Sequence, residues 1–263
     1  MTADYKNWVP KGMLYVLFVL SGLTLACLVI FGICGIATAG IGRIIAGIVS
    51  AAAFTACALF TAWAVNAYCA FSYNGKRQLS RRIIQGIAEY VSLPKGGRGL
   101  DVGCGSGALT IACAKKNPDA FMTGLDRWGK EYASFNKPLC EKNAAAEGVS
   151  NTDFVQGNAV KLDYKDETFD AVTSNYVYHN IPVSDRQQLL LETLRVLKKG
   201  GTFAIHDLMS SARYGDMQAF IETLKKQGYE KAELIDTAQG LFMTPAEAKV
   251  LLLSGSTLLV GKK

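Results

Sequence analysis

The sequence predicts an α/β domain with a doubly wound parallel sheet, preceded by a hairpin of two membrane-spanning helices. Before residue 76 there are two long stretches without a charged side chain, separated only by Arg43. From about residue 76 onward, short apolar runs bounded by turn residues alternate with amphipathic stretches. This alternation is the pattern of strands and helices in a doubly wound sheet. Hydrophobic residues make up 50% of the 263 residues, and the excess lies in the first part of the chain.

Each uncharged stretch is longer than the roughly 20 apolar residues that a bilayer crossing needs. We expect one transmembrane helix over residues 13–37 and a second over residues 44–71. A cleaved signal peptide is the alternative for the first stretch, but the run is too long and a second run follows at once. The expected organisation is a lead-in with two spans over residues 1–75 and one α/β domain over residues 76–263.

Basic residues precede the first expected span and follow the second. They are Lys6 and Lys11 before the first span, and Lys76, Arg77, Arg81 and Arg82 after the second. The positive-inside rule therefore places both termini and the α/β domain in the cytoplasm, so we expect a multi-pass protein of the cell membrane. The basic cluster can also contact anionic lipid headgroups. The formal charge of +6 thus requires no nucleic-acid partner, and we expect none.

Small residues recur on both expected spans. Examples are Gly32 and Gly35 on the first span and Gly47 and Ala51 on the second. Such residues permit close backbone contact between helices. The contact could lie within the hairpin or between protomers of a homo-oligomer, and the sequence leaves both open.

A glycine-rich turn follows the first expected strand of the α/β domain. Residues 100–110 read LDVGCGSGALT. Glycine permits a positive φ and close approach of a ligand to the backbone, and a helix that begins at the turn directs free N–H groups at that ligand. A dinucleotide site would have the spacing G-x-G-x-x-G. Here the glycines alternate at positions 103, 105 and 107 and follow Asp101.

This D-x-G-x-G-x-G pattern resembles the first motif of the class I S-adenosylmethionine-dependent methyltransferases. Further features follow in the order of that family: an expected strand over residues 121–126 that ends in an acid, an FD motif at residues 169–170, and LRVLKKGG before a strand at residues 202–205. The resemblance covers about residues 97–263. It implies a Rossmann-like seven-stranded sheet whose last pair of strands is antiparallel, and S-adenosylmethionine as the cofactor.

A narrower likeness, to membrane-tethered bacterial methyltransferases with a D-x-W-G second motif, rests on Asp126, Trp128 and Gly129. In the family the acid at Asp126 holds the ribose hydroxyls, and the residues after it flank the adenine. Trp128 would therefore stack on the adenine, with packing as the alternative. Gly129, Tyr132 and Phe135 could equally form a substrate lid.

The resemblance assigns the remaining cofactor contacts. Asn158 stands where the family often has an acid that accepts from the adenine amino group, and its side-chain oxygen can still accept. The thiol of Cys104 would pack beside the cofactor. The residues expected to contact the cofactor are Asp101, Gly103, Cys104, Gly105, Gly107, Asp126, Arg127, Trp128, Gly157, Asn158, Ala159 and Asn175. No cluster of carboxylates, cysteines or histidines in the sequence argues for a metal.

Methyl transfer needs chiefly that the nucleophile and the methyl group are held close together while water is excluded. A general base is needed only where the nucleophile must lose a proton. Of the two histidines, His179 follows the fourth expected strand and is the sharper candidate base, and His206 at the end of the fifth is the second. A helix-capping or packing role is the alternative for His179, and a core histidine bonded to the backbone is the alternative for His206. Tyr176 and Tyr178 would face the cationic methyl donor or form apolar walls for the acceptor.

The sequence thus predicts an enzyme that methylates a hydrophobic or membrane-associated small molecule, such as a lipid, a lipoquinone or a lipophilic thiol or amine. The membrane anchor is the only reason to prefer a lipid-like acceptor. The alternatives are a soluble acceptor behind the same anchor and a non-catalytic S-adenosylmethionine sensor. A nucleic-acid methyltransferase is disfavoured because the motif N-P-P-Y is absent from residues 175–178, which read NYVY.

Overall fold

The computed structural model describes residues 2–36, 38–129 and 134–263. The chain divides into two compact units, of which one is Asn7–Ser80. The other unit joins the residues up to Lys6 with Arg81–Lys263. The segment before the hairpin therefore packs with the α/β unit, which differs from the expected organisation with residues 1–75 as one part.

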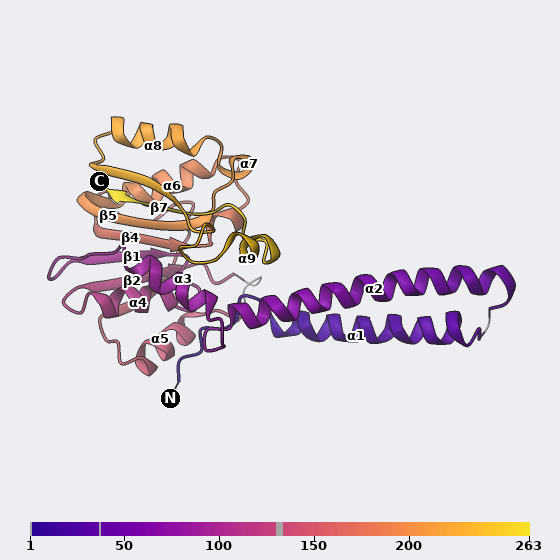
Figure 1. Cartoon of the computed structure of the whole chain (residues 1–263). Helices are drawn as coiled ribbons and strands as arrows, with labels where there is room; N and C mark the ends of the chain where they lie inside the picture. Colours follow the sequence, from indigo (N-terminus) through magenta and orange to yellow (C-terminus); the bar gives the residue numbers. More distant parts are fainter. Residues whose placement is uncertain (1, 37, 130–133) are drawn as a thin grey trace. The chain divides into compact units, whose positions relative to one another are not determined.

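The α/β unit contains a seven-stranded sheet in the order β3-β2-β1-β4-β5-β7-β6 (Figure 1). Its strands are β1 (Arg98–Val102), β2 (Phe121–Asp126), β3 (Thr152–Gln156), β4 (Phe169–Asn175), β5 (Leu197–Leu208), β6 (Lys231–Asp236) and β7 (Ser256–Lys262). Strands β1 to β5 pair in parallel, and β7 is antiparallel to both β5 and β6. This confirms the predicted Rossmann-like sheet with an antiparallel last pair.

Helices alternate with the strands, as the sequence pattern predicts. They are α3 (Leu79–Ala88), α4 (Ala108–Lys116), α5 (Lys137–Ala146), the 3-10 turn η3 (Tyr178–Asn180), α6 (Arg186–Arg195), α7 (Ser211–Tyr214), α8 (Met217–Lys226) and α9 (Pro245–Val250). Polar side chains begin several of them: Asn136 caps α5, Asp185 caps α6, and Asp216 caps α8. Each cap accepts a hydrogen bond from an N–H group that has no partner within the helix.

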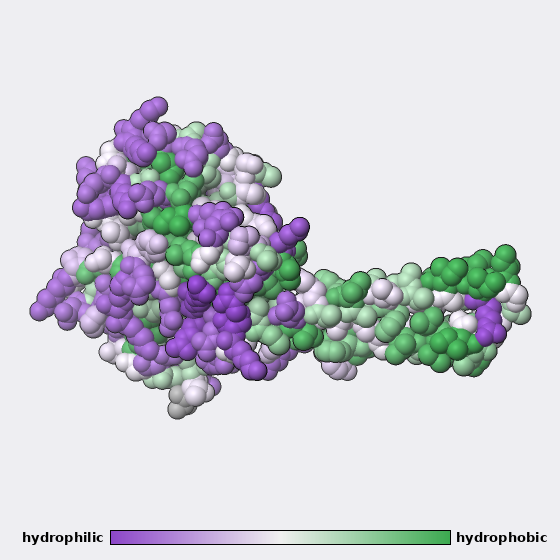
Figure 2. Space-filling model, viewed as in Figure 1, coloured by the Kyte–Doolittle hydropathy of each residue, from purple (hydrophilic) through white to green (hydrophobic). Residues whose placement is uncertain are grey.

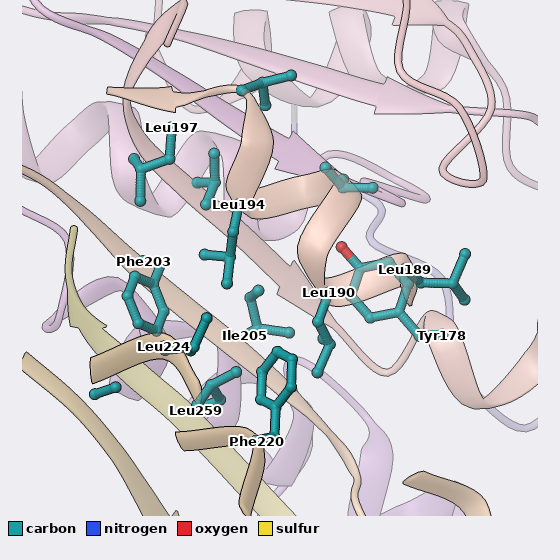
Figure 3. Packing of buried hydrophobic residues seen from close by; sticks show 14 of the residues in the cluster. Tyr178, Leu189, Leu190, Leu194, Leu197, Phe203, Ile205, Phe220, Leu224 and Leu259 are labelled. Atoms are coloured by element: carbon teal, nitrogen blue, oxygen red, sulfur yellow. The ribbon is translucent and has the colours of Figure 1, made fainter. Parts of the chain in front are cut away.

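The main hydrophobic core lies where α6 and α8 pack on the middle of the sheet. In Figure 3, Leu190 and Leu194 of α6 and Leu224 of α8 point toward Phe203 and Ile205 of β5. All five side chains are almost completely buried. This core holds β4 and β5 side by side, so the segments that follow these two strands emerge together at one edge of the sheet.

The hairpin unit consists of two long apolar helices. The first runs as α1 (Lys11–Cys27) into a π-helical turn, η1 (Leu28–Ile33), and the second is α2 (Gly40–Phe71). Both are long and apolar enough to cross a membrane, and hydrophobic side chains cover most of their surface in Figure 2. The helices begin slightly before the expected residues 13 and 44, and the first ends before residue 37.

Small and polar residues join the two helices of the hairpin. A Cβ atom added to Gly32 would lie 2.9 Å from the Cα of Gly47, so the two backbones are in direct contact there. Further along, the hydroxyl of Ser21 lies 2.9 Å from that of Thr61. Arg43 donates to the carbonyls of Gly32 and Ile33, which lack helical partners at the end of the first helix. Of the two alternatives left open by the sequence, these contacts support packing within the hairpin.

We expect Gly32→Val to weaken this hairpin by about 1–3 kcal/mol, because the new side chain would collide with the backbone of Gly47. Gly22→Val is the matched control, since no atom lies within 4 Å of a Cβ added at Gly22. Unfolding of the full chain in mixed micelles of increasing SDS content, followed by tryptophan fluorescence, measures both. Equal stability of the two variants would contradict the Gly32–Gly47 contact.

Candidate functional site

The glycine loop after β1 lies at the edge of the sheet where the parallel strands end. Gly103 and Gly105 have φ angles of 77° and 55°, in the region that disfavours side chains. A Cβ on Gly103 would lie 2.3 Å from the side chain of Val177, so the loops after β1 and β4 are in direct contact. Among the described residues, no heavy atom lies within 4 Å of a Cβ added to Gly105. This part of the loop therefore has room for a ligand close to its backbone.

Asp126, at the end of β2, is held between the glycine loop and the segment after it. One carboxylate oxygen accepts from the N–H of Gly105 and the other from the N–H of Trp128, each at 2.8 Å. A carboxylate can accept about four hydrogen bonds, so both oxygens can accept further ones from ribose hydroxyls. The position fits the expected ribose contact.

Trp128 lies against the same loop. Its indole Nε1 donates to the carbonyl of Gly105 at 3.1 Å, and its backbone has a positive φ of 44°. A non-glycine residue in this conformation is uncommon and is often found at functional sites. The ring is thus positioned beside the open side of the loop. Arg127 is exposed, and Tyr132 of the expected lid lies outside the described residues.

Asp101 differs from its expected role as a cofactor contact. Its carboxylate is almost fully buried and accepts from the hydroxyls of Thr110 at 2.7 Å and Thr173 at 2.9 Å. Burial raises its pKa from 3.8 to about 6, although the two hydroxyls oppose this shift. Because the group is enclosed, Asp101 supports the glycine loop from beneath. Cys104 is also buried, and burial raises the pKa of its thiol, which is therefore neutral.

The loop after β3 contains three expected cofactor contacts. Asn158 is exposed, and its side-chain oxygen accepts from the N–H of Val160 at 2.9 Å, which leaves that oxygen one further lone pair. A Cβ on Gly157 would lie 2.6 Å from the side chain of Leu125, so this glycine permits close packing. Ala159 is buried in the main core. Of the three, Asn158 is the one that remains open to a ligand.

His179 and Asp207 form a hydrogen-bonded pair at the ends of β4 and β5. Nδ1 of His179 donates to Oδ1 of Asp207 at 2.5 Å, and the backbone N–H of His179 donates to Oδ2 at 3.2 Å. The Asp207 side chain is fully buried, whereas 17% of the His179 side chain is exposed. Burial opposes ionisation of Asp207, but the hydrogen bonds from His179 and Leu208 outweigh it and lower the pKa. Asp207 is thus a buried carboxylate that orients the imidazole.

Arg186 holds the turn that carries His179. Its guanidinium donates to the carbonyl of Tyr178 at 3.2 Å and to those of His179 and Ile181 at 3.4 Å each. The carbonyls of Tyr178 and Ile181 also accept from the backbone N–H groups of Ile181 and Val183, at 3.1 and 2.9 Å, so Arg186 is a second donor to each. The ring position of His179 is therefore set from two sides, by Asp207 and by Arg186.

His206 is a buried core histidine, which corrects the expectation of a second candidate base. Its Nδ1 lies 2.9 Å from Oδ1 of Asn175, and its Nε2 lies 2.8 Å from the hydroxyl oxygen of Thr237, which also donates to the carbonyl of Ser256. Burial lowers its pKa to about 3, so the ring is neutral. Both nitrogens are engaged, and no part of the ring is exposed. Asn175 is likewise occupied by this contact.

The two tyrosines after β4 have different surroundings. Tyr176 has a positive φ of 54°, and its hydroxyl donates to the Ser256 hydroxyl at 2.6 Å. Its ring centroid lies 6.1 Å from that of His179, so it stays beside the candidate base. Tyr178 is fully buried in the main core, with its hydroxyl 2.6 Å from that of Thr193. Tyr178 therefore packs the core and does not face a methyl donor, contrary to expectation.

Sequence reasoning missed the partners of these residues. Asp207 stands directly after His206, and nothing in the sequence links it to a histidine 28 positions away. Arg186 looked like an ordinary helix residue. A signal did exist for Asp207, since it stands at the end of a predicted strand in a sheet whose strand ends form the site.

Residues 100–205 match the protein family described as a methyltransferase domain. This part of the chain, which includes the glycine loop and strands β1 to β4, is thus similar to a methyltransferase domain. Relatives of similar sequence include the demethylmenaquinone methyltransferases of Geobacillus stearothermophilus, 30% identical over 135 residues, and of Listeria monocytogenes, 32% identical over 127 residues. These matches cover 51% and 48% of this chain and 55% and 51% of the relatives. The chain thus spans about half the length of the curated relatives it matches.

Solved structures share the fold of the methyltransferase domain. The cyclase SpnF matches with a TM-score of 0.54 at 20% identity, over 73% of this chain and 85% of that protein. A geranyl diphosphate methyltransferase matches with a TM-score of 0.52 at 12% identity, over 71% of this chain and 79% of that protein. A class I methyltransferase domain implies binding of S-adenosylmethionine, and the space at Gly105 beside Asp126 fits such a ligand.

We expect Gly105→Ala to weaken S-adenosylmethionine binding at least tenfold, because the methyl group would occupy the space beside the loop backbone. Gly148→Ala is the matched control: Gly148 also has a positive φ and no atom within 4 Å of an added Cβ, but it follows α5. Both variants carry a similar backbone strain, and only the first should lose affinity in calorimetry. Equal affinities would argue against a ligand at Gly105.

Asp101 should make the stability of the methyltransferase domain depend on pH. Because its folded-state pKa of about 6 exceeds the ordinary value of 3.8, the folded protein binds more protons between these values. Stability from this group is present below about pH 4 and is lost as the pH rises to about 6, by up to about 3 kcal/mol. Asp101→Asn should remove this component. Denaturation in detergent at several pH values measures it, and identical pH profiles would refute the assignment.

Proposed function

We propose that this chain is an S-adenosylmethionine-dependent methyltransferase that acts on a lipoquinone-like hydrophobic acceptor. The observation that carries the proposal is the contact of Val177 with Gly103, which brings the loop of the His179–Asp207 pair against the glycine loop. A cofactor site and a candidate base are thereby neighbours at one edge of the sheet. The similarity to demethylmenaquinone methyltransferases supports this class of acceptor.

The cofactor contacts follow from the loop geometry. When bound, S-adenosylmethionine supplies an electrophilic methyl group on a sulfonium centre. Asp126 would accept hydrogen bonds from the ribose hydroxyls, and Trp128 would cover the adenine from the open side of the loop. The backbone around Gly105 would approach the ligand closely. Asn158, whose oxygen keeps a free lone pair, would accept from the adenine amino group.

His179 is the proposed general base. Asp207 holds the Nδ1–H of the imidazole, so the lone pair of the neutral ring lies on Nε2. Within the described parts of the chain no hydrogen bond engages Nε2. A hydroxyl of the acceptor would transfer its proton to Nε2, and the negative charge of Asp207 would stabilise the imidazolium. A quinol that loses this proton would be electron-rich enough for a ring carbon to take the methyl group. The methyl–sulfur bond would break with its electron pair staying on sulfur, so S-adenosylhomocysteine would leave, and loss of the ring C–H proton would restore the aromatic ring.

This arrangement favours catalysis over a sensor. A sensor needs the glycine loop and Asp126 alone, whereas a partly exposed histidine oriented by a buried carboxylate serves proton transfer. His206, Asn175 and Tyr176 then act as positioning residues that keep the ends of β4 and β5 together. A soluble acceptor behind the same anchor is the remaining alternative, and the relatives do not favour it.

The membrane part of the proposal rests on the hairpin and on charge. The two apolar helices would cross the cell membrane, with both termini and the methyltransferase domain in the cytoplasm. A lipoquinone is dissolved in the bilayer, so an anchored enzyme and its acceptor would share one phase. This is the physical advantage of the hairpin for such an acceptor.

Transfer to lipid tests the function directly. The full chain in detergent is incubated with radiolabelled S-adenosylmethionine and either reduced demethylmenaquinone or a total membrane lipid extract. We expect label in the organic phase with both. Label confined to the aqueous phase would indicate a soluble acceptor. Cofactor binding with no transfer to any acceptor would indicate the sensor.

We expect His179→Ala to lower kcat about 10²- to 10⁴-fold, the usual contribution of a general base. S-adenosylmethionine affinity should stay within about threefold, since the imidazole is not among the proposed cofactor contacts. Asp207→Asn should also lower kcat, because the amide cannot stabilise the imidazolium. Asn180→Ala, in the same turn and exposed, is the matched control. Equal losses of kcat and cofactor affinity in His179→Ala would mark His179 as structural.

A further inference from the structure

The described residues before the hairpin contact the glycine loop of the methyltransferase domain. We call Asp4 and Tyr5 the N-terminal strap. Tyr5 is almost fully buried, and its carbonyl accepts from the hydroxyl of Ser106 at 3.0 Å. Ser106 stands inside the glycine loop, directly after Gly105. In Figure 1 the N-terminal segment runs close to α5.

Asn143 of α5 joins the strap to the same loop. Its side-chain oxygen accepts from the N–H of Asp4 at 2.8 Å, and its Nδ2 donates to the carbonyl of Asp4 at 3.0 Å. The same Nδ2 also donates to the carbonyl of Ser106 at 3.0 Å. Asn143 is fully buried, so its amide depends on these partners. The strap, α5 and the loop thus form one hydrogen-bonded unit.

A turn at Lys6 ends the strap. The carboxylate of Asp4 accepts from the backbone N–H of Lys6 at 3.1 Å and pairs with its ammonium at 2.6 Å. Lys6 has a positive φ of 55°, so the chain turns there. This local turn, which Asp side chains commonly form, ends the strap immediately before the hairpin unit begins at Asn7.

We propose that the N-terminal strap is a positioning element of the cofactor site. A loop with alternating glycines has little stiffness of its own. The strap and Asn143 hold Ser106 by its hydroxyl and its carbonyl, and this fixes the peptide next to the open face of Gly105. Docking of the strap therefore strengthens S-adenosylmethionine binding, and binding of the cofactor strengthens docking of the strap. The inference rests on the proposed cofactor but not on the proposed acceptor.

The reciprocity makes the proposal testable without methyl transfer. If a docked strap raises cofactor affinity by some factor, the cofactor must stabilise the docked strap by the same factor. Two variants weaken docking. Ser106→Ala removes the hydroxyl that binds Tyr5, and Asn143→Ala removes the amide that binds Asp4. Thr168→Ala is the matched control, because it also removes a hydroxyl bound to a backbone carbonyl, before the start of β4.

The full chain and each variant are placed in lipid nanodiscs, and S-adenosylmethionine affinity is measured by calorimetry. We expect at least fivefold weaker binding for Ser106→Ala and Asn143→Ala, and unchanged binding for Thr168→Ala. Hydrogen exchange of the peptide containing residues 2–6 is then compared with and without the cofactor. The cofactor should slow exchange there by a similar factor in the wild type and in the control, and less in the two variants.

Several results would overturn the proposal. Unchanged affinity in Ser106→Ala with a lowered melting temperature would mean that the strap only stabilises the fold. Exchange of residues 2–6 that does not respond to the cofactor would show that the strap is uncoupled from the site. Failure of the wild type to bind S-adenosylmethionine would refute it together with the cofactor assignment. Strap-dependent binding without methyl transfer would leave this inference standing and refute only the proposed catalysis.

Discussion

The buried carboxylate of Asp101 is the constraint on which the site depends. The carboxylate accepts one hydrogen bond from a hydroxyl of α4 and one from a hydroxyl of β4. It thus joins β1, β4 and α4 beneath the glycine loop. A carboxylate taken out of water needs such partners, because its desolvation is costly. The loop above it can then adopt left-handed backbone angles while its base stays fixed. Val177 contacts Gly103 for the same reason, since β1 and β4 are held in register.

The polar side chains at the ends of the strands differ in whether they are buried or remain open to a ligand. At the end of β2, Asp126 binds backbone N–H groups and keeps capacity for a ligand. At the end of β5, adjacent residues of one strand point to opposite faces, so His206 enters the interior while Asp207 reaches His179. Burial makes His206 neutral and inert, and hydrogen bonds keep Asp207 charged despite its burial. His179 is therefore the histidine at this edge that remains partly exposed.

The hairpin is an insertion in the sequence of the methyltransferase domain. Residues before it contact the glycine loop through Ser106, and the domain resumes at Arg81. A membrane anchor placed simply in front of a domain would leave the first residues free. Here Tyr5 is buried and Asp4 binds Asn143 of α5, so a chain that began at residue 76 would lack part of the packing around the glycine loop.

From the sequence alone follow the succession of strands and helices in the α/β domain up to β5, the apolar hairpin, and the glycine loop with Asp126 and Trp128 after the next strand. These features are local, because hydrophobic periodicity, glycine spacing and strand-end acids are written within short segments. Only the tertiary structure decided the roles of Tyr178, His206 and Asp101, which are buried, and of Asp207 and Tyr5, which find partners 28 and 101 positions away. Burial and long-range hydrogen bonds depend on how the strands pair and pack, and no short segment contains that information.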